Sequence, residues 1–176
     1  MIERIIIAGS GGQGVMLLGK VLVSSAMKEG KFVTWLPAYG PEVRGGAAHC
    51  MVVISDSEIG SPFVDKADSL IIMNSQSLDK FKNRLKENGI MILNNSLADI
   101  NIKKSLVIKY PFTDIAQDLG NIKVANMVAL GCFLAHKKIA GLKSVFSTIV
   151  EFAPAGKKEL IEVNKKAILK GMELKK

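Results

Sequence analysis

The chain has 176 residues, of which 48% are hydrophobic and 23% charged, so it is large and apolar enough to form one folded domain without disulfides or metal ions to hold it together. The 24 Lys and Arg outnumber the 16 Asp and Glu, but the basic stretch at residues 153–176 has no aromatic residues between its lysines, which argues against a nucleic-acid-binding protein. Two cysteines are too few for a disulfide framework or for the four thiolates that an iron–sulfur cluster usually needs. No apolar run approaches the roughly 20 residues of a membrane-spanning helix, and no export signal is visible, so we expect a cytoplasmic protein with no membrane segment.

The first third of the chain predicts a strand, a helix and a second strand. Residues 5–8 form a β-branched run that ends at glycines, which is typical of a strand buried on both faces. Apolar residues recur at helical spacing between residues 13 and 28, and Gly30 follows as a stop signal. Residues 32–36 are predicted to form the second strand, so the three elements have the size of one parallel β-α-β unit.

The rest of the chain continues this rhythm and then becomes helical. Short apolar runs predict further strands at residues 50–54, 69–73, 90–93 and 106–108. The sequence does not indicate the direction of the strand at residues 50–54. Helical spacing predicts helices at residues 78–87, 113–119, 126–138, 142–152 and 158–170. We therefore predict an α/β fold in one domain, residues 1–176: a single doubly wound, Rossmann-like, mostly parallel sheet with helices on both faces and a helical C-terminal third.

A glycine-rich motif lies between the first strand and the first helix. Gly9-Ser10-Gly11-Gly12-Gln13-Gly14 has the G-x-G-x-x-G spacing in the context that this motif requires. Glycines let the chain turn sharply and let backbone N–H groups at a helix N-terminus approach an anion closely. The motif therefore predicts a site for a phosphate or carboxylate, and the alternative is a tight turn that serves packing alone. Residues 33–37 contain no Asp or Glu for the ribose of a nicotinamide cofactor, and no Gly-Lys-Ser/Thr follows the glycines.

A second loop rich in proline and glycine follows the second strand. It reads Leu36-Pro37-Ala38-Tyr39-Gly40-Pro41-Glu42-Val43-Arg44-Gly45-Gly46 and lies at the carboxyl end of the strand, where open α/β sheets bind ligands. The glycines beside Arg44 would let backbone amides and a guanidinium face one anion. The alternative is a rigid connector with a solvent-facing arginine.

Cysteine and histidine residues elsewhere predict no catalytic or metal site. His49 and Cys50 are neighbours on a strand, so their side chains are expected on opposite faces of the sheet. Cys132 and His136 are one helical turn apart, but they offer only two ligands where a metal site normally has four. Asn126 and Ser96 are expected to act as helix caps, which leaves them outside the predicted site.

Several motifs together resemble the gamma subunit of 2-oxoacid:ferredoxin oxidoreductases, in the pyruvate/ketoisovalerate oxidoreductase catalytic domain family. They are the two loops above, the Ile59-Gly60-Ser61-Pro62 turn and the Met73-Asn74 strand end. The resemblance runs through Asn94-Asn95-Ser96 and Asn126-Met127. The form of the second loop is more similar to the 2-oxoglutarate and branched-chain 2-oxoacid enzymes than to the pyruvate enzymes.

This resemblance implies one subunit of a complex that oxidatively decarboxylates a 2-oxoacid to its acyl-CoA and reduces ferredoxin. Thiamine diphosphate, Mg and iron–sulfur clusters would lie on partner alpha, beta and small ferredoxin-like delta subunits. This chain would hold no cofactor and no catalytic residue, would be inactive alone, and could form a homodimer when isolated. It would complete the assembly and help to bind coenzyme A through residues of both loops: Gly9, Gly11, Gly12, Gln13, Gly14, Tyr39, Arg44, Gly45 and Gly46. The alternative is a free-standing nucleotide-binding α/β enzyme or sensor that uses the glycine motif.

Overall fold

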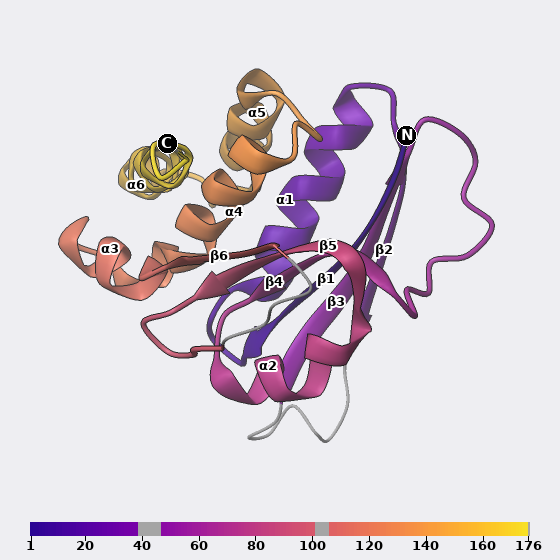
Figure 1. Cartoon of the computed structure of the whole chain (residues 1–176). Coiled ribbons are helices and arrows are strands. Elements are labelled where there is room, and N and C mark those ends of the chain that lie inside the picture. The colour runs from indigo at the N-terminus through magenta and orange to yellow at the C-terminus, as the bar shows by residue number, and fades with distance from the viewer. Residues whose placement is uncertain (39–46, 101–105, 176) are drawn as a thin grey trace.

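A computed structural model describes residues 1–38, 47–100 and 106–175 of the chain (Figure 1). The strands are β1 (Ile2–Ser10), β2 (Phe32–Ala38), β3 (Ala47–Ser55), β4 (Ala67–Ile72), β5 (Leu85–Asn94) and β6 (Leu106–Tyr110). The α-helices are α1 (Val15–Lys28), α2 (Ser75–Phe81), α3 (Phe112–Asp118), α4 (Ala125–His136), α5 (Leu142–Phe152) and α6 (Lys158–Met172). The short 3-10 turns η2 (Lys82–Arg84) and η3 (Ile122–Val124) follow α2 and precede α4.

The six described strands form one sheet in the order β2-β3-β1-β4-β5-β6. β1, β4, β5 and β6 pair in parallel, whereas β3 runs antiparallel to both of its neighbours. The predicted mostly parallel sheet is thus confirmed, with one difference. β1 and β2 point the same way, as a β-α-β unit requires, but β3 is inserted between them.

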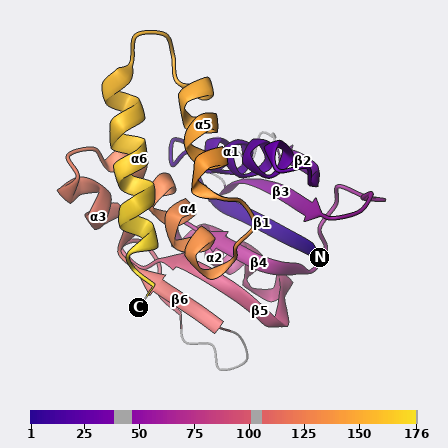
Figure 2. The ribbon, with the colours of Figure 1, turned by 90° about the horizontal axis from the view of Figure 1, so that it is seen from above.

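Helices cover both faces of the sheet, unevenly. α1, α4, α5 and α6 lie on one face and α2 lies on the other (Figures 1 and 2). Alternate residues of β1 supply the two cores, because successive side chains of a strand point to opposite faces: Ile5 and Ile7 pack toward α1, and Ile6 and Ala8 pack toward α2. The doubly wound fold and the helical C-terminal third are therefore confirmed.

α4 and α6 cross at two glycines. A Cβ atom added to Gly131 would lie 2.0 Å from the carbonyl oxygen of Ile168, and one added to Gly171 would lie 2.0 Å from the carbonyl oxygen of Val128. Carbon and oxygen atoms do not approach so closely, so the two helix backbones are in contact where neither residue has a side chain. α4 itself is buried along nearly its whole length.

The predicted helix at residues 78–87 is wrong at both ends. Asn74 caps α2, since its Oδ1 accepts a hydrogen bond from the Ser77 N–H at 2.9 Å, and the helix therefore begins at Ser75. It ends at Phe81, and after η2 the strand β5 already begins at Leu85, which pairs with Ala67.

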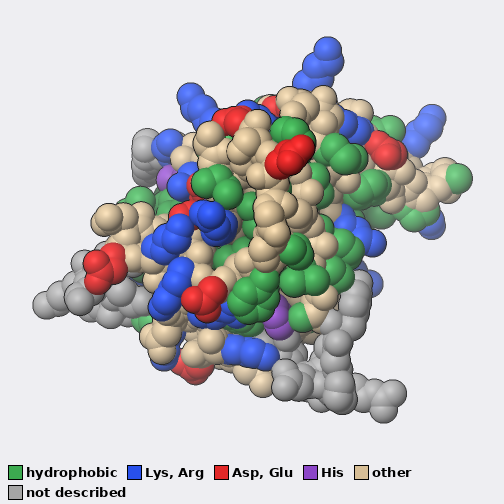
Figure 3. Space-filling view, turned by 90° about the vertical axis from the view of Figure 1, so that its right-hand side faces the viewer, with side chains coloured by type: hydrophobic (Ala, Val, Ile, Leu, Met, Phe, Trp, Pro, Cys, Tyr) green, Lys and Arg blue, Asp and Glu red, His purple; other side chains and the backbone are tan. Residues whose placement is uncertain are grey.

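β2 is an edge strand with exposed apolar side chains. Phe32 and Leu36 are four residues apart, so they share one face of the strand, and they are 46% and 37% exposed. The space-filling view of this side of the molecule shows hydrophobic side chains gathered between lysines and arginines (Figure 3). Among the described residues, no helix has the length and apolar character needed to cross a bilayer.

Candidate functional site

The glycine loop, residues 9–14, joins β1 directly to α1. Gly12 has φ +88° and Gly14 has φ +69°, a backbone conformation that residues with a Cβ rarely adopt. A Cβ on Gly9 would lie 2.9 Å from Met73 Cβ, and one on Gly14 would lie 2.3 Å from Asn126 Nδ2. Gly11 and Gly12 are instead exposed, and a Cβ on Gly12 would meet nothing within 4 Å. The outer glycines are therefore required by packing, and the exposed inner pair forms the free surface of the loop.

The Gln13 side chain holds the loop in shape. Its Oε1 accepts a hydrogen bond from the Ser10 N–H at 2.6 Å, and its Nε2 donates to the carbonyl oxygen of Met73 at 3.3 Å. The Gln13 N–H also donates to the Ser10 carbonyl at 3.2 Å, which closes the turn. Because both ends of the amide are engaged within the protein, Gln13 positions the loop and ties it to the end of β4.

Three asparagines from other elements support the same edge of the sheet. Asn126, at the start of α4, donates from Nδ2 to the Gly14 carbonyl at 3.0 Å. Asn74 donates to Ser10 Oγ. Asn94, at the end of β5, donates to the Met73 carbonyl at 3.1 Å and to Thr113 Oγ1 at 2.8 Å.

Sequence analysis missed the long-range role of Asn126. The prediction of Asn126 as a cap is wrong, because the N-cap of α4 is Val124, which makes no side-chain cap hydrogen bond. Asn126 lies in the first turn of α4, where its Oδ1 accepts from the Met127 N–H at 2.9 Å and its Nδ2 fixes the start of α1. Ser96 is not the N-cap of α3, which is Pro111, but its Oγ does accept a hydrogen bond from the Asp114 N–H in the first turn of that helix at 3.3 Å. The sequence does contain a signal for this supporting role, because each of the three asparagines lies at the end of a predicted strand or at the start of a predicted helix.

Two cavities flank the exposed part of the glycine loop. One, of about 200 Å³, lies toward α3 and is lined by Gly12, Gln13, Thr113 and Lys123 among others. The other, of about 380 Å³, is lined by residues of the loop, the first turn of α1, and the ends of β2 and β3: Ser10, Gly11, Gly12, Gly14, Val15, Met16, Leu17, Ala38 and Ala48. No side chain among the described residues caps the N-terminus of α1. The second cavity therefore adjoins a helix end that carries free N–H groups and a partial positive charge.

Tyr39, Arg44, Gly45 and Gly46 of the predicted second loop lie outside the described residues. The strands that flank this loop are described. β2 ends at Ala38 and β3 begins at Ala47, which pairs with Ser10 at the end of β1. Both ends of the second loop are thus at the edge of the sheet that carries the glycine loop, and the two loops leave the same rim.

The two thiols have the environment of core residues. Burial raises the pKa of Cys50 to about 12 and that of Cys132 to about 12, so both remain protonated at neutral pH. The ring of His49 packs against Phe81 on the face of the sheet opposite Cys50, which confirms that the neighbouring pair cannot act together.

The environment of Cys132 and His136 does not suit a metal or an iron–sulfur cluster. His136 Nδ1 lies 2.8 Å from the Cys132 carbonyl oxygen and 4.0 Å from Cys132 Sγ. Within residues 1–38, 47–100 and 106–175, no three His, Cys, Asp or Glu side chains are grouped as metal ligands. A cluster needs several thiolates, and these two separate buried thiols do not fit one.

The sequence profile of the pyruvate ferredoxin/flavodoxin oxidoreductase family matches residues 4–174. The chain belongs to this family. The match covers nearly the whole sequence and confirms the resemblance drawn from the two loops and the strand ends.

Two relatives within this oxidoreductase family show how the chain corresponds to whole subunits. It is 40% identical over 172 residues to the ketoisovalerate oxidoreductase subunit VorA of Methanothermobacter marburgensis, a match that covers 97% of this chain and 36% of VorA. It is 35% identical over 181 residues to the 2-oxoglutarate synthase subunit KorC of Methanocaldococcus jannaschii, covering 100% of this chain and 95% of KorC. The chain thus spans about a third of VorA and nearly all of KorC.

Two solved structures have the same fold. The gamma subunit of a keto/oxoacid ferredoxin oxidoreductase from Geobacter sulfurreducens superposes with a TM-score of 0.85 at 28% identity, over 98% of this chain and 97% of that one. The second is a 2-oxoglutarate:ferredoxin oxidoreductase from Magnetococcus marinus with 2-oxoglutarate, coenzyme A and succinyl-CoA bound. It superposes with a TM-score of 0.89 at 20% identity, over 98% of this chain and 31% of that one. At that identity the second likeness concerns the fold alone.

Proposed function

We propose that this chain is the gamma-type part of a complex that oxidatively decarboxylates 2-oxoglutarate or a branched-chain 2-oxoacid to its acyl-CoA and passes the electrons to ferredoxin. The observation that carries the proposal is the family match over residues 4–174. The substrate class is supported by the names of the relatives, a ketoisovalerate oxidoreductase and a 2-oxoglutarate synthase.

The chemistry of the reaction is assigned to alpha, beta and delta partner subunits, which would hold thiamine diphosphate, Mg and iron–sulfur clusters. The high pKa of both thiols supports this division, because protonated buried cysteines are poor cluster ligands. The exposed Phe32 and Leu36 of β2 offer an apolar edge of the kind that partner subunits cover. We place the complex in the cytoplasm. The chain without its partner subunits would be inactive.

The proposed contribution of this chain is an anion-accepting surface for the phosphate groups of coenzyme A. Gly11 and Gly12 lie exposed above the uncapped start of α1. Backbone N–H groups and the positive end of the helix favour a negative charge there, and the lack of side chains lets it approach closely. Arg44 in the second loop would supply a guanidinium on the same rim.

A matched pair of substitutions at Gly12 tests this surface. Asp and Asn have nearly the same shape, and both tolerate a positive φ better than other residues with a Cβ, so the comparison of Gly12→Asp with Gly12→Asn isolates the charge. The assay is the KM for coenzyme A of the assembled complex in 2-oxoacid-dependent ferredoxin reduction. We expect the aspartate variant to have a KM about tenfold above that of the asparagine variant, because about 1.4 kcal/mol of repulsion corresponds to that factor. Arg44→Ala should raise the same KM.

Gly30 provides the control, because it also has a positive φ (+78°), has nothing within 4 Å of an added Cβ, and lies beyond the other end of α1. Gly30→Asp and Gly30→Asn should give the same KM. Equal KM values for the two Gly12 variants and an unchanged Arg44→Ala complex would refute the anion surface. A complex that reduces ferredoxin with no dependence on a 2-oxoacid would refute the proposed reaction instead.

A further inference from the structure

A cavity of about 540 Å³ opens at the end of α1 that is opposite the glycine loop. The ends of four helices surround it. Its lining residues include Glu29 just after α1, Leu134 in the last turn of α4, Leu142 at the start of α5 and Met172 at the end of α6. Its volume is within the range of about 300 to 1,000 Å³ that is usual for sites of small molecules. The proposed anion surface lies at the other end of α1.

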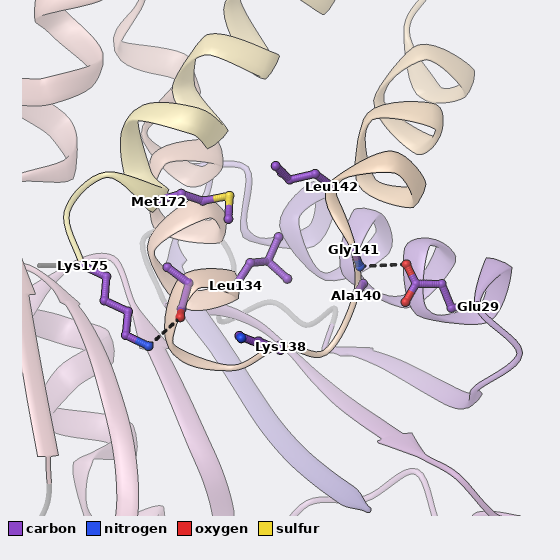
Figure 4. A pocket seen from close by; sticks show the side chains of 9 residues that line it. Glu29, Leu134, Lys138, Ala140, Gly141, Leu142, Met172 and Lys175 are labelled. Carbon is purple, nitrogen blue, oxygen red and sulfur yellow. Dashed lines mark hydrogen bonds between the residues drawn. The ribbon is translucent and has the colours of Figure 1, made fainter.

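The wall of the cavity is apolar. Leu134, Leu142 and Met172 converge on it from three helices, and Ala140 completes the wall from the segment between α4 and α5 (Figure 4). Met172 has an unbranched, flexible side chain that can adapt to the shape of a ligand. The cavity therefore offers continuous hydrocarbon contact but few polar groups.

The charged groups are arranged unevenly around this wall. Glu29 lies at one end, and its Oε1 accepts a hydrogen bond from the Gly141 N–H at 2.7 Å (Figure 4). Lys175 lies at the other end and donates to the Ala135 carbonyl at 2.9 Å. Lys138 lies between them, is exposed, and has no hydrogen bond or ion pair with any residue in the described part of the chain. Lys138 is thus the lining charge that remains available to a ligand.

We propose that this cavity binds a carboxylate with an unbranched aliphatic chain, of the size of octanoate. The chain would lie against Leu134, Leu142 and Met172, and the carboxylate would pair with Lys138 Nζ. The two lysines disfavour a cationic amphiphile, and Glu29 directs the carboxylate away from its own end of the cavity. A neutral alcohol would gain the apolar contacts but leave Lys138 without a counter-ion.

Methyl NMR of the full chain labelled at methionine provides a site-specific test. Met172 lines the cavity, while Met1 and Met27 are 57% and 58% exposed at other places and report non-specific binding. Octanoate should shift the Met172 methyl signal saturably and leave those of Met1 and Met27 in place. Each methylene added to the ligand, from hexanoate to octanoate, should tighten binding about fourfold, which corresponds to about 0.8 kcal/mol.

Charge and volume variants identify the residues responsible. Lys138→Gln should weaken octanoate binding by up to about fivefold, the upper limit for an exposed ion pair, and should leave octanol binding unchanged. Lys158→Gln, at the start of α6, is the matched control and should bind octanoate as the parent chain does. Ala140→Phe should narrow the cavity and weaken the octanoate-induced shift of the Met172 methyl signal. If that variant fails to fold, the comparison of Lys138→Gln with Lys158→Gln still tests whether the charge of Lys138 contributes to octanoate binding.

Three results would overturn the proposal. One is a shift that is linear in octanoate or equal at Met1, Met27 and Met172. Another is binding of octylamine as tight as that of octanoate. The third is self-association that shields Met172 while octanoate has no effect, which would assign the cavity to a second copy of the chain. None of these results bears on the anion surface, because that surface lies at the other end of α1.

Discussion

Replacing Gly131 by alanine tests the contact between α4 and α6. The added Cβ would lie 2.0 Å from the Ile168 carbonyl oxygen and 2.8 Å from the carbonyl carbon. Real Cβ atoms essentially never come within 3.0 Å of another heavy atom, so the helices must separate by about 1 Å or α4 must bend. The obstacle is backbone rather than a flexible side chain, so no rotamer change relieves it.

The expected loss of stability is a balance of two terms. Overpacking of this kind costs typically about 1 to 3 kcal/mol, and the clash with a backbone carbonyl places Gly131→Ala at the upper end. Alanine returns about 1 kcal/mol, because glycine is the poorer helix former. The net loss of about 2 kcal/mol should lower the Tm by roughly 4 to 8 °C for a domain of this size.

Thermal and urea unfolding measure this loss, and Gly60→Ala is the control. Gly60 has no positive φ and nothing within 4 Å of an added Cβ, so its replacement should leave stability unchanged or slightly raised. Gly171→Ala should behave like Gly131→Ala, and the double variant should lose less than the sum, because one separation of α4 from α6 relieves both clashes. A Gly131→Ala chain as stable as the parent would refute the close helix contact.

Two further predictions concern ionisable groups. Hydrogen bonds from Lys31 and from the N-terminal amine lower the pKa of Asp56 from 3.8 to about 2, so the pair stabilises the fold above about pH 4 and this stabilisation is lost as the pH falls toward 2. The Tm difference between the parent and Asp56→Asn should therefore shrink as the pH falls from 4 to 2, and a difference that is the same at pH 7 and pH 2 would contradict the assignment. Because burial raises the pKa of Cys50 and Cys132 to about 12, neither thiol should react with iodoacetamide at pH 8 until the chain is unfolded in urea, as mass spectrometry would detect; rapid alkylation of the native chain would show that they are accessible.

Local signals predicted most of the elements but not their neighbours in space. The helix at residues 142–152 was predicted with the bounds of α5, because its apolar spacing and the flanking glycine are properties of a short segment. The insertion of β3 between β1 and β2 depends on pairing between residues far apart in sequence, such as Ile5 with Val52. The early start of β5 has the same cause, since the helix-forming residues around Lys86 become a strand only by pairing beside β4.

The candidate site was predictable in its motif and not in its supports. The spacing of Gly9 to Gly14 indicated a loop between strand and helix, and the structure has it there. The sequence did not separate the packed glycines from the exposed pair, because that distinction depends on Met73 and Asn126, which come from distant elements. The predicted contribution of Tyr39, Arg44, Gly45 and Gly46 to anion binding stays a prediction, as does that of the glycine loop.

The central place of β1 has a consequence for how the chain folds as it is synthesised. Its two neighbours, β3 and β4, begin only at Ala47 and Ala67, so the first strand leaves the ribosome long before either can pair with it. During that interval α1 is the only described element close in sequence that packs on it. The amphipathic helix would shelter one face of the nascent strand, and the sheet would then grow outward from both sides of it as later segments emerge.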